Sequence, residues 1–332
     1  MPLTLRAECV VPLDGPPIDE GMVVVDDGVI LAVGRQVEAC GRVEEFPGCV
    51  LLPGLVNSHT HLEFSSLEKP LGEPGMPLAD WIREVIAWRT RRSRDPQAAI
   101  QQGLCESLAC GVTTVGEIAT APAAAYLADR SPRLAMFHEV IGFSRGRIES
   151  VAAHLDQRLK AAAPLAAVAT GISPHAPYTV HPELLRRLVA TAADQRRTVA
   201  IHLAESLAEL ELLAEGAGPL QQLLDERSMW DAEAIPVGST PADYLNILRQ
   251  APRGLVVHGN YLSEPEIALL ARQPTMSVVY CPRTHAYFQH RRYPLAEMLA
   301  AGGRGVIGTD SRASSPDLSL LTEIQWVPAA FP

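Results

Sequence analysis

The sequence predicts an α/β protein in which a (β/α)8 barrel follows a small N-terminal β-sandwich unit. Its 332 residues suffice for one barrel-sized domain with an appendage. From Val50 onward, eight short apolar runs alternate with stretches rich in Ala, Leu and Arg that have helical spacing. This alternation is typical of a parallel barrel with helices on its outside. Polar and metal-ligating residues follow the ends of most of these runs, which is where a barrel places its chemistry.

The first 49 residues have a different pattern. Residues 21–34 contain two short strand patterns that an Asp27-Gly28 turn joins, and residues 7–13 contain a third. We therefore expect a β unit, part of a sandwich, over residues 1–49 and the barrel over residues 50–332. The last helical pattern starts near Leu320, and no strands return to the β unit. This favours a truncated chain with an incomplete last barrel helix and without the C-terminal half of the sandwich.

The expected barrel elements alternate along the chain. The first strand is apolar nearly throughout, as in a strand that is buried on both faces. The expected strands are 50–58, 112–117, 134–140, 168–174, 198–203, 254–258, 276–281 and 305–309. The expected helices are 97–110, 148–163, 182–195, 206–215 and 264–272.

Composition argues against several classes of function. The formal net charge of −10 disfavours a nucleic-acid partner, whose phosphates attract basic patches. The six cysteines form no Cys-x-x-Cys pair, which disfavours a zinc ribbon and suits reduced thiols in a cytoplasm. No signal peptide and no apolar stretch of about 18 residues is present. We expect a cytoplasmic protein that acts on a small molecule and binds neither nucleic acid nor membranes, with a homo-oligomer left open.

His59-Thr60-His61, at the end of the first strand, is the most informative motif. Two imidazoles at positions i and i+2 of an extended segment lie on the same side, so both can bind one ion. A His-x-His pair alone is a weak signal, because such pairs also occur by chance on surfaces. Taken singly, His202 would be interpreted as a core histidine and Asp310 as a cap or turn residue.

The ends of later strands supply further candidates. Strand five ends at His202 with Glu205 shortly beyond it, strand six ends at His258, and Asp310 follows strand eight. Three neutral imidazoles and one carboxylate suit a borderline divalent ion, with zinc favoured and iron as the alternative. The expected ligand set for one such ion, with a position left for water, is His59, His61, His202 and Asp310.

Four segments, Pro53–His61, His202–Glu205, Val257–Asn260 and Gly308–Ser311, resemble the amidohydrolase superfamily. More closely, they resemble its branch of chlorohydrolases and aminohydrolases, which includes the S-adenosylhomocysteine, methylthioadenosine and aminodeoxyfutalosine deaminases. The resemblance runs in family order from about residue 5 to the end of the chain. It implies a metal-dependent barrel flanked by a β-sandwich that both chain ends build.

The resemblance also implies roles for single residues. Two-metal members carry a carboxylated lysine at the end of strand four, where this chain has His175 and no lysine, which implies one metal. Asp310 would ligate that metal and accept a proton from the attacking water, while His258 would orient the water from outside the ligand set. Glu205 would carry a proton to a ring nitrogen and then to the leaving amine. Its alternative interpretation is a solvated glutamate in a first helical turn.

The candidate substrate contacts are His175, Trp81, Glu63 and Arg145. His175 resembles the strand-four histidine that deaminases of this branch use. Trp81 is either a stacking partner for a purine or a buried helix anchor. Glu63 and Arg145 belong to the rim, where ion pairs within the protein would also explain them. The same holds for Glu117, Glu139, Arg283 and His285, whereas His138, His154, His181 and His290 are interpreted as ordinary histidines.

Together these features predict a metal-dependent aminohydrolase that releases ammonia from a ring carbon of an adenine-type nucleoside or a related amino-heterocycle. The same machinery would serve a chlorohydrolase or a guanine- or cytosine-type deaminase, because pocket shape selects the leaving group. A truncated, inactive remnant that binds metal is the remaining alternative.

Overall fold

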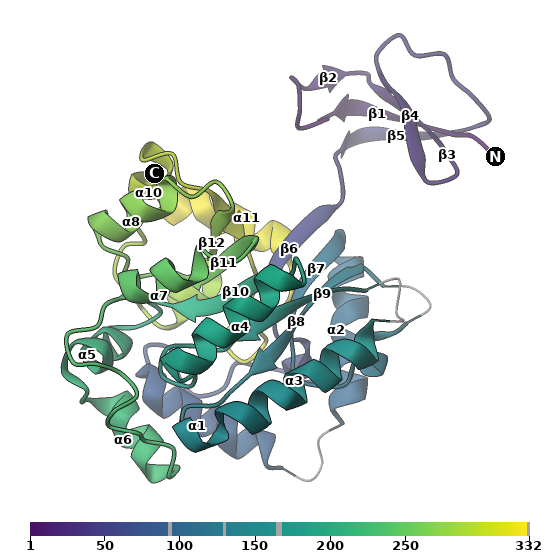
Figure 1. Cartoon of the computed structure of the whole chain (residues 1–332). Coiled ribbons are helices and arrows are strands. Elements are labelled where there is room, and N and C mark those ends of the chain that lie inside the picture. The colour runs from purple at the N-terminus through teal and green to yellow at the C-terminus, as the bar shows by residue number, and fades with distance from the viewer. Residues whose placement is uncertain (92–94, 129–130, 164–167, 331–332) are drawn as a thin grey trace. The chain divides into compact units, whose positions relative to one another are not determined.

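A computed structural model describes residues 1–91, 95–128, 131–163 and 168–330 (Figure 1). The chain divides into two compact units, Met1–Gly54 and Leu55–Pro332. The division therefore falls later than the expected boundary after residue 49. The reason is β5 (Arg42–Leu51), which pairs with the first strand of the chain and extends the N-terminal unit.

The expected strand over residues 50–58 is wrong as a single element. Its first part belongs to β5 of the N-terminal sheet, and its second part is β6 (Leu55–Thr60) of the barrel. Pro53 and Gly54 lie between them outside any strand. Proline has no N–H to donate to a strand ladder, so a continuous strand through this point is disfavoured. The apolar run therefore crosses from one unit to the other.

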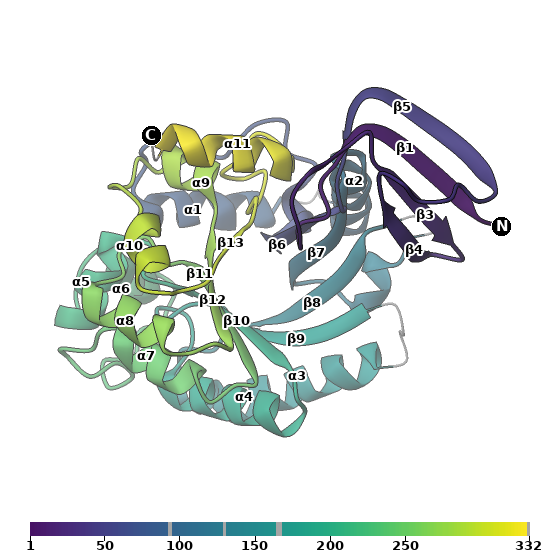
Figure 2. The same cartoon turned by 90° about the horizontal axis from the view of Figure 1, so that it is seen from above.

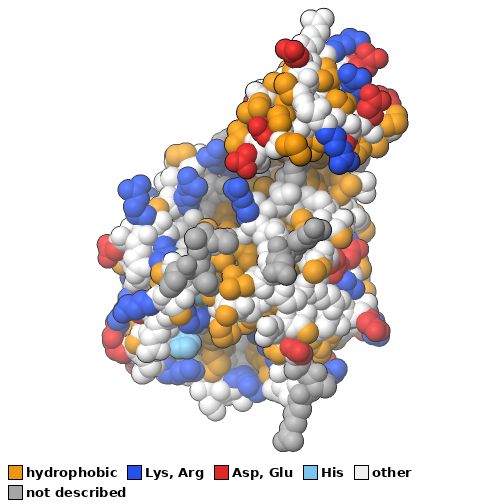
Figure 3. Space-filling view, turned by 90° about the vertical axis from the view of Figure 1, so that its right-hand side faces the viewer, with side chains coloured by type: hydrophobic (Ala, Val, Ile, Leu, Met, Phe, Trp, Pro, Cys, Tyr) orange, Lys and Arg blue, Asp and Glu red, His pale blue; other side chains and the backbone are white. Residues whose placement is uncertain are grey.

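The N-terminal unit is a five-stranded sheet. The strands β2 (Ile18–Asp19), β1 (Leu3–Val10), β3 (Met22–Asp26) and β4 (Val29–Gly34) pair antiparallel in that order, and β5 pairs parallel with β1. The predicted turn at Asp27-Gly28 is confirmed, with φ of 47° and 74°, which is the left-handed pair of a type I′ hairpin. The side of this unit seen in Figure 3 has exposed hydrophobic side chains interspersed with charged ones.

The second unit is the predicted barrel of eight parallel strands in sequential order. β6 is followed by β7 (Val112–Ala119), β8 (Arg133–Val140), β9 (Val168–Pro174), β10 (Thr198–Leu203), β11 (Arg253–His258), β12 (Met276–Tyr280) and β13 (Gly305–Ile307). Seen from above, they curve around a common centre with helices outside (Figure 2). A bridge between Thr60 and Asp310, with Asp310 N donating to His59 O at 3.1 Å, joins the two ends of the sheet.

The helices include all five that the sequence predicts: α2 (Pro96–Ala109), α3 (Ile148–Ala162), α4 (Pro182–Asp194), α5 (Leu207–Glu215) and α8 (Glu264–Ala271). Local signals set their starts, as in α2, where Asp95 accepts from Ala98 N and Pro96 occupies the first position. The structure adds the helices α1 (Leu78–Arg89), α6 (Pro219–Glu226), α7 (Pro241–Leu248), α9 (Pro282–Tyr287) and α10 (Leu295–Ala300). It also contains the short 3₁₀ turns η1 (Leu62–Phe64), η2 (Ala123–Tyr126) and η3 (Arg145–Arg147). The helix α11 (Leu320–Ala330) begins where the last helical pattern starts.

Two layers of core position the strand ends. A large apolar cluster packs between the outside of the sheet and helices such as α3, α4 and α7, while a small cluster of Ile118, Phe137 and Ala200 fills the barrel interior. The filled interior leaves the carboxyl ends of the strands as the place for a site. None of the described helices has the length and apolar character needed to cross a membrane.

Candidate active site

Four histidines and one aspartate meet at the carboxyl end of the barrel. His59 and His61 come from the end of β6, His202 from β10, His258 from β11, and Asp310 from the segment after β13. The Nε2 atoms of His61 and His202 are 3.3 Å apart, and Oδ1 of Asp310 lies 3.6 Å from His59 Nε2 and 3.8 Å from His61 Nε2. All five side chains are buried. The structure therefore brings all residues of the predicted ligand set together and places His258 beside them.

The protonation states suit ligation of a cation. Burial lowers the pKa of His61, His202 and His258 well below the ordinary histidine value, with Asp310 opposing the shift, so these imidazoles are neutral. Burial alone would raise the pKa of the Asp310 carboxyl, but the neighbouring imidazoles hold it low. The Nδ1 atom of His202 is paired with the carbonyl oxygen of His175 at 2.8 Å, which leaves Nε2 as the ligating nitrogen.

This cluster fits a divalent ion. Two triads, His59 with His202 and His258, and His59 with His61 and Asp310, each have one ligand atom per residue within 4.8 Å of the others. Buried His59 Nε2 has no hydrogen-bond partner among the described residues. A buried polar atom without a partner is rare and costly, and an ion between the two triads would satisfy it. Both triads share His59.

Glu205 lies beside this cluster. Its Oε1 atom is 3.4 Å from His258 Nε2, and Tyr178 donates its hydroxyl to Oε2 at 3.3 Å. Burial raises the pKa of Glu205 well above the ordinary value, and the carboxylates of Asp310 and Glu209 raise it further. This environment favours the protonated form of the carboxyl group, which can act as a proton donor. The alternative, a solvated glutamate at the start of a helix, is excluded by its burial.

Sequence reasoning missed the residue that shapes the turn before Glu205. Glu209 of α5 accepts hydrogen bonds from Ala204 N at 2.8 Å and Glu205 N at 3.0 Å. Asn260 donates to the carbonyl oxygen of Glu205 at 2.8 Å. The pattern Ser206-x-x-Glu209 is a helix-capping signature in the sequence, and Ser206 does accept from Glu209 N. That signal could have identified Glu209, although its carboxylate reaches further back than a capping box requires.

A second missed residue is Asn57 of β6, whose side chain forms hydrogen bonds with Thr309, just after β13. Its side chain donates to Thr309 Oγ1 at 2.8 Å and accepts from Thr309 N at 3.1 Å. Close packing continues at Gly308, where an added Cβ would lie 2.8 Å from His59 Cβ. These contacts fix His59 and Asp310 relative to each other.

A cavity of about 230 Å³ opens above the cluster. His61, His202, Glu205, His258 and Asp310 line its floor. Its walls are mostly apolar, from α1 and from the segment around α6. The wall residues include Phe64, Leu78, Ile82, Val85, Ile86, Leu223, Leu224 and Met229. An apolar pocket with a few convergent polar groups is the usual form of a small-molecule site.

Two of the four predicted substrate contacts line this cavity. The His175 ring is centred 5.0 Å from that of His202, and burial lowers its pKa to about 3. Trp81 also lines the cavity, while its Nε1 donates to Ala313 O at 3.2 Å. Trp81 is therefore anchored by its polar edge at the cavity, and stacking on a purine stays a prediction.

The structure does not bring the other two, Glu63 and Arg145, into the cavity. Glu63 is buried and accepts from Arg89, which itself lines the cavity, and from Thr120. Arg145 is exposed, 3.9 Å from Glu183, and its backbone N–H donates to Asp231. Side chains that pair within the protein are common at a barrel rim, and the sequence does not distinguish them from substrate contacts.

The remaining rim candidates serve the fold. Glu117 accepts from Leu62 N at 3.0 Å and from Thr60 Oγ1 at 2.7 Å. Arg283 forms ion pairs with Glu323 and Asp317. Neither of these residues lines the cavity, and Glu139 and His285 do not line it either. The same holds for the histidines interpreted as ordinary, which are His138, His154, His181 and His290.

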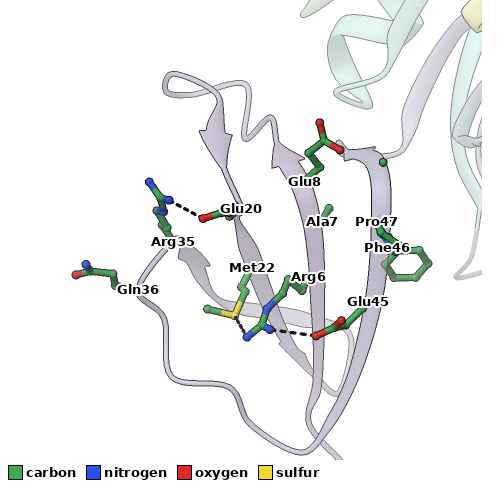
Figure 4. Close-up of a pocket in the computed structure, with 11 residues that line it drawn as sticks. Arg6, Ala7, Glu8, Glu20, Met22, Arg35, Gln36, Glu45, Phe46 and Pro47 are labelled. Carbon is green, nitrogen blue, oxygen red and sulfur yellow. Dashed lines mark hydrogen bonds and ion pairs between the residues drawn. The ribbon is translucent and has the colours of Figure 1, made fainter.

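A wider hollow of about 640 Å³ lies on the N-terminal sheet (Figure 4). Its charged side chains pair with each other, Arg6 with Glu45 at 3.0 Å and Arg35 with Glu20. Neither group of possible metal ligands among the described residues lies there. The chemistry therefore belongs to the smaller cavity in the barrel.

A parallel barrel with clustered imidazoles and a carboxylate at its strand ends defines the class of metal-dependent barrel hydrolases. Within this class, the chain belongs to the amidohydrolase family, whose model matches residues 50–329. Members of this family use a divalent metal. The family match covers the barrel and every candidate site residue named above.

Individual relatives are similar over most of the chain. An aminodeoxyfutalosine deaminase of Deinococcus radiodurans is 31% identical over an alignment of 329 positions. The alignment covers 92% of this chain and 77% of the relative. A 5-methylthioadenosine/S-adenosylhomocysteine deaminase of Natronomonas pharaonis is 29% identical, with 90% and 66% covered. The crystal structure of Helicobacter pylori aminofutalosine deaminase with methylthio-coformycin has a TM-score of 0.84 at 22% identity, covering 99% of this chain and 82% of that chain. At this identity the last similarity shows the fold alone.

Proposed function

We propose that this protein is an aminohydrolase that uses one divalent metal ion to deaminate an adenine-type nucleoside. The observation that supports this most directly is Glu205, a buried carboxyl group with a raised pKa that lies 3.4 Å from His258 in the cavity that holds the possible metal ligands. Such a group is suited to protonate a ring nitrogen. The two sequence relatives described above are named as deaminases of adenosine-type nucleosides, which supports the same reaction here.

The ion would be bound by His59, His61, His202 and Asp310, with His258 close by. Imidazoles and a single carboxylate suit zinc, and iron is the second candidate. When bound, such an ion lowers the pKa of water from ~15.7 to about 7 and so supplies hydroxide at neutral pH.

The side chains of the site then move the protons. Asp310 accepts the proton that the attacking water loses, and His258 orients that water. The water oxygen bonds to the ring carbon while Glu205 protonates the adjacent ring nitrogen. In place of the delivery by Glu205 that the sequence leads us to expect, the proton on Asp310 passes to the exocyclic nitrogen, the carbon–nitrogen bond breaks, and ammonia leaves. The new hydroxyl returns its proton to Glu205 as the ring carbonyl forms, so the site is restored.

The alternatives differ in the leaving group or in activity. A chlorohydrolase releases chloride, which leaves without a proton. In this site Glu205 is held by the Tyr178 hydroxyl in a position suited to proton transfer, which favours an amine as the leaving group. A guanine- or cytosine-type deaminase would use the same proton path on a different purine or on a pyrimidine. An inactive metal-binding remnant would retain the ligand cluster and lack turnover.

The experiment is metal analysis followed by an ammonia-release screen on the full chain. We expect about one equivalent of zinc or iron, and ammonia from at least one of adenosine, methylthioadenosine, S-adenosylhomocysteine and aminodeoxyfutalosine. Guanine, cytosine and a chlorotriazine test the alternatives. Glu205→Gln should lose at least a hundredfold in kcat and keep its metal, and the exposed Glu211→Gln on α5 is the control. Release of ammonia at an unchanged rate by Glu205→Gln would contradict the proton-transfer role.

A further inference from the structure

Glu117 is a buried carboxyl group that the proposed reaction does not use. It lies in β7 with none of its surface exposed, and it pairs in the sheet with Thr60 of β6. Its Oε2 atom is 2.7 Å from the Thr60 hydroxyl, and both of its oxygens lie within 3.1 Å of Leu62 N. Thr60 and Leu62 stand directly before and after His61. Glu117 therefore contacts the chain on both sides of a proposed metal ligand.

His61 lacks the contact that usually orients a histidine bound to a metal. Such a histidine nearly always donates its second ring N–H to an acceptor, which fixes the ring. His202 has this contact, because its Nδ1 atom is paired with His175 O. The buried Nδ1 atom of His61 has no hydrogen-bond partner among the described residues. The orientation of the His61 ring therefore depends on the position of the backbone that carries it.

The sheet holds this backbone only in part. The register between β6 and β7 is irregular from Asn57 to Thr60, and β6 ends at Thr60. Leu62 then begins the 3₁₀ turn η1, and the first N–H groups of a helical turn have no partner within it. Glu117 supplies that partner with its side chain. Because an unsatisfied buried N–H is costly, this contact favours one position of the segment from Thr60 to Leu62.

The surroundings of Glu117 favour the protonated form of its carboxyl group. Burial raises its pKa well above the ordinary value, the hydrogen bonds and the Tyr126 hydroxyl oppose this shift, and the nearby Glu63 carboxylate adds to it. In the protonated form, one oxygen accepts from Leu62 N and the other donates to the Thr60 hydroxyl. That hydroxyl lies 3.2 Å from the carbonyl oxygen of the residue before Glu117, which can accept its proton. A glutamine side chain offers the same donor and acceptor.

We propose that Glu117 is a positioning residue, which holds the proposed metal ligand His61 in place through hydrogen bonds to the residues on either side. This inference rests on the proposed metal site and goes beyond it, because Glu117 lies outside both the ligand set and the lining of the cavity. The role is expressed in how tightly the ion is bound. It can therefore be measured without turnover.

The test measures the zinc affinity of the full chain, by competition between the metal-free protein and a chromophoric chelator. Glu117→Leu removes both hydrogen bonds and should weaken zinc binding roughly ten- to hundredfold, the usual effect of losing a contact that supports a ligand. Glu117→Gln should stay within about threefold of the wild type. In the His61→Ala background, Glu117→Leu should change the affinity less than about twofold, because the ligand through which it acts is gone.

The control is Glu266→Leu. Glu266 is also a buried carboxyl group that accepts from a backbone N–H and a hydroxyl, both of Ser263, but it stands in the first turn of α8. This variant should lose stability in urea unfolding and keep the zinc affinity of the wild type. If Glu117→Leu does not fold, Thr60→Val removes the hydroxyl from the same contact and should weaken zinc binding roughly three- to tenfold.

Three results would overturn the inference and leave the proposed function standing. They are wild-type zinc affinity in folded Glu117→Leu or in Thr60→Val, equal losses in Glu117→Leu and Glu117→Gln, and a full further loss in the His61→Ala background. A wild-type chain that binds neither zinc nor iron would overturn both the inference and the proposed function.

Discussion

Glu209→Gln is the substitution that most directly tests how the fold positions the catalytic carboxyl. Glu209 accepts from two buried N–H groups, Ala204 N at 2.8 Å and Glu205 N at 3.0 Å. Glutamine has the same shape but only one acceptor oxygen, so its NH2 group would face the second N–H. One hydrogen bond is lost and one buried donor is left unsatisfied. Ala204 has a φ of 53°, a conformation that a non-glycine residue adopts only when its surroundings enforce it.

The magnitude follows from these contacts. An unsatisfied buried donor costs about 1–3 kcal/mol, so we expect a loss of about 2 kcal/mol in the free energy of unfolding. The same hydrogen bonds hold the backbone that positions Glu205. Losing one of them should therefore make the productive position of the Glu205 side chain less favourable by the same amount, about 2 kcal/mol. At about 1.4 kcal/mol per factor of ten, kcat falls roughly thirtyfold. Metal content should be unchanged, because His202 is oriented by its separate contact with His175 O at 2.8 Å.

The assay measures urea unfolding, metal content and steady-state kinetics on one preparation of each variant. Glu211→Gln is the matched control, because Glu211 is an exposed glutamate of the same helix. Its stability and kcat should match those of the wild type. An unchanged kcat in Glu209→Gln would refute the positioning role. A fall in kcat that only follows loss of metal would assign the effect to the ligands instead.

Three further substitutions test other contacts. Gly308→Ala should lower kcat at least tenfold with little loss of solubility. The new Cβ would lie 2.8 Å from His59 Cβ, so His59 must move. Steady-state kinetics and metal analysis will check this expectation. Burial lowers the pKa of His138 from 6.5 to about 4, so the folded state loses stability relative to the unfolded state as the pH falls below 6.5. This loss amounts to about 2 kcal/mol between pH 7.5 and pH 5. His138→Leu should remove this pH dependence, which urea titrations at the two pH values will measure. Trp81→Phe keeps an aromatic side chain, with a phenyl ring in place of the larger indole, and removes the hydrogen bond to Ala313 O. It should cost at least about 1 kcal/mol of stability and change KM less than about twofold, and a large KM change would contradict that expectation.

The barrel was predictable because its signal repeats. Alternating apolar runs and helical stretches occur throughout the second unit, and seven of the expected strands match β7 to β13 closely. The first strand was not predictable from apolar character alone, because Val50 and Leu51 pair in one sheet while Leu55 begins another. Sheet membership depends on long-range pairing, which local patterns do not contain.

The strand-end residues of the site were predictable for the same reason, since topology alone brings the carboxyl ends of parallel strands together. The residues that position them were not. Asn57 and Glu209 act through backbone atoms of other segments, and the helix-capping signature that includes Glu209 does not reveal that its carboxylate reaches Ala204 N. Charged residues at the rim also pair within the protein, so Glu63 and Arg145 carried the same signal in the sequence as true cavity residues.

The site is fixed at three left-handed residues that stand at strand ends: Ala204, His258 and Asp310, with φ of 53°, 69° and 58°. Each such conformation costs roughly 1–2 kcal/mol for a residue with a side chain. Each is held by a hydrogen bond to a different element, namely Ala204 N to Glu209, Tyr293 Oη to His258 O at 2.7 Å, and Asp310 N to His59 O at 3.1 Å. Loss of one bond should therefore release one catalytic side chain and leave the other two in place. Contacts outside the cluster set the orientation of the proposed metal ligands and of Glu205, which is why the sequence indicated these residues and not their orientation.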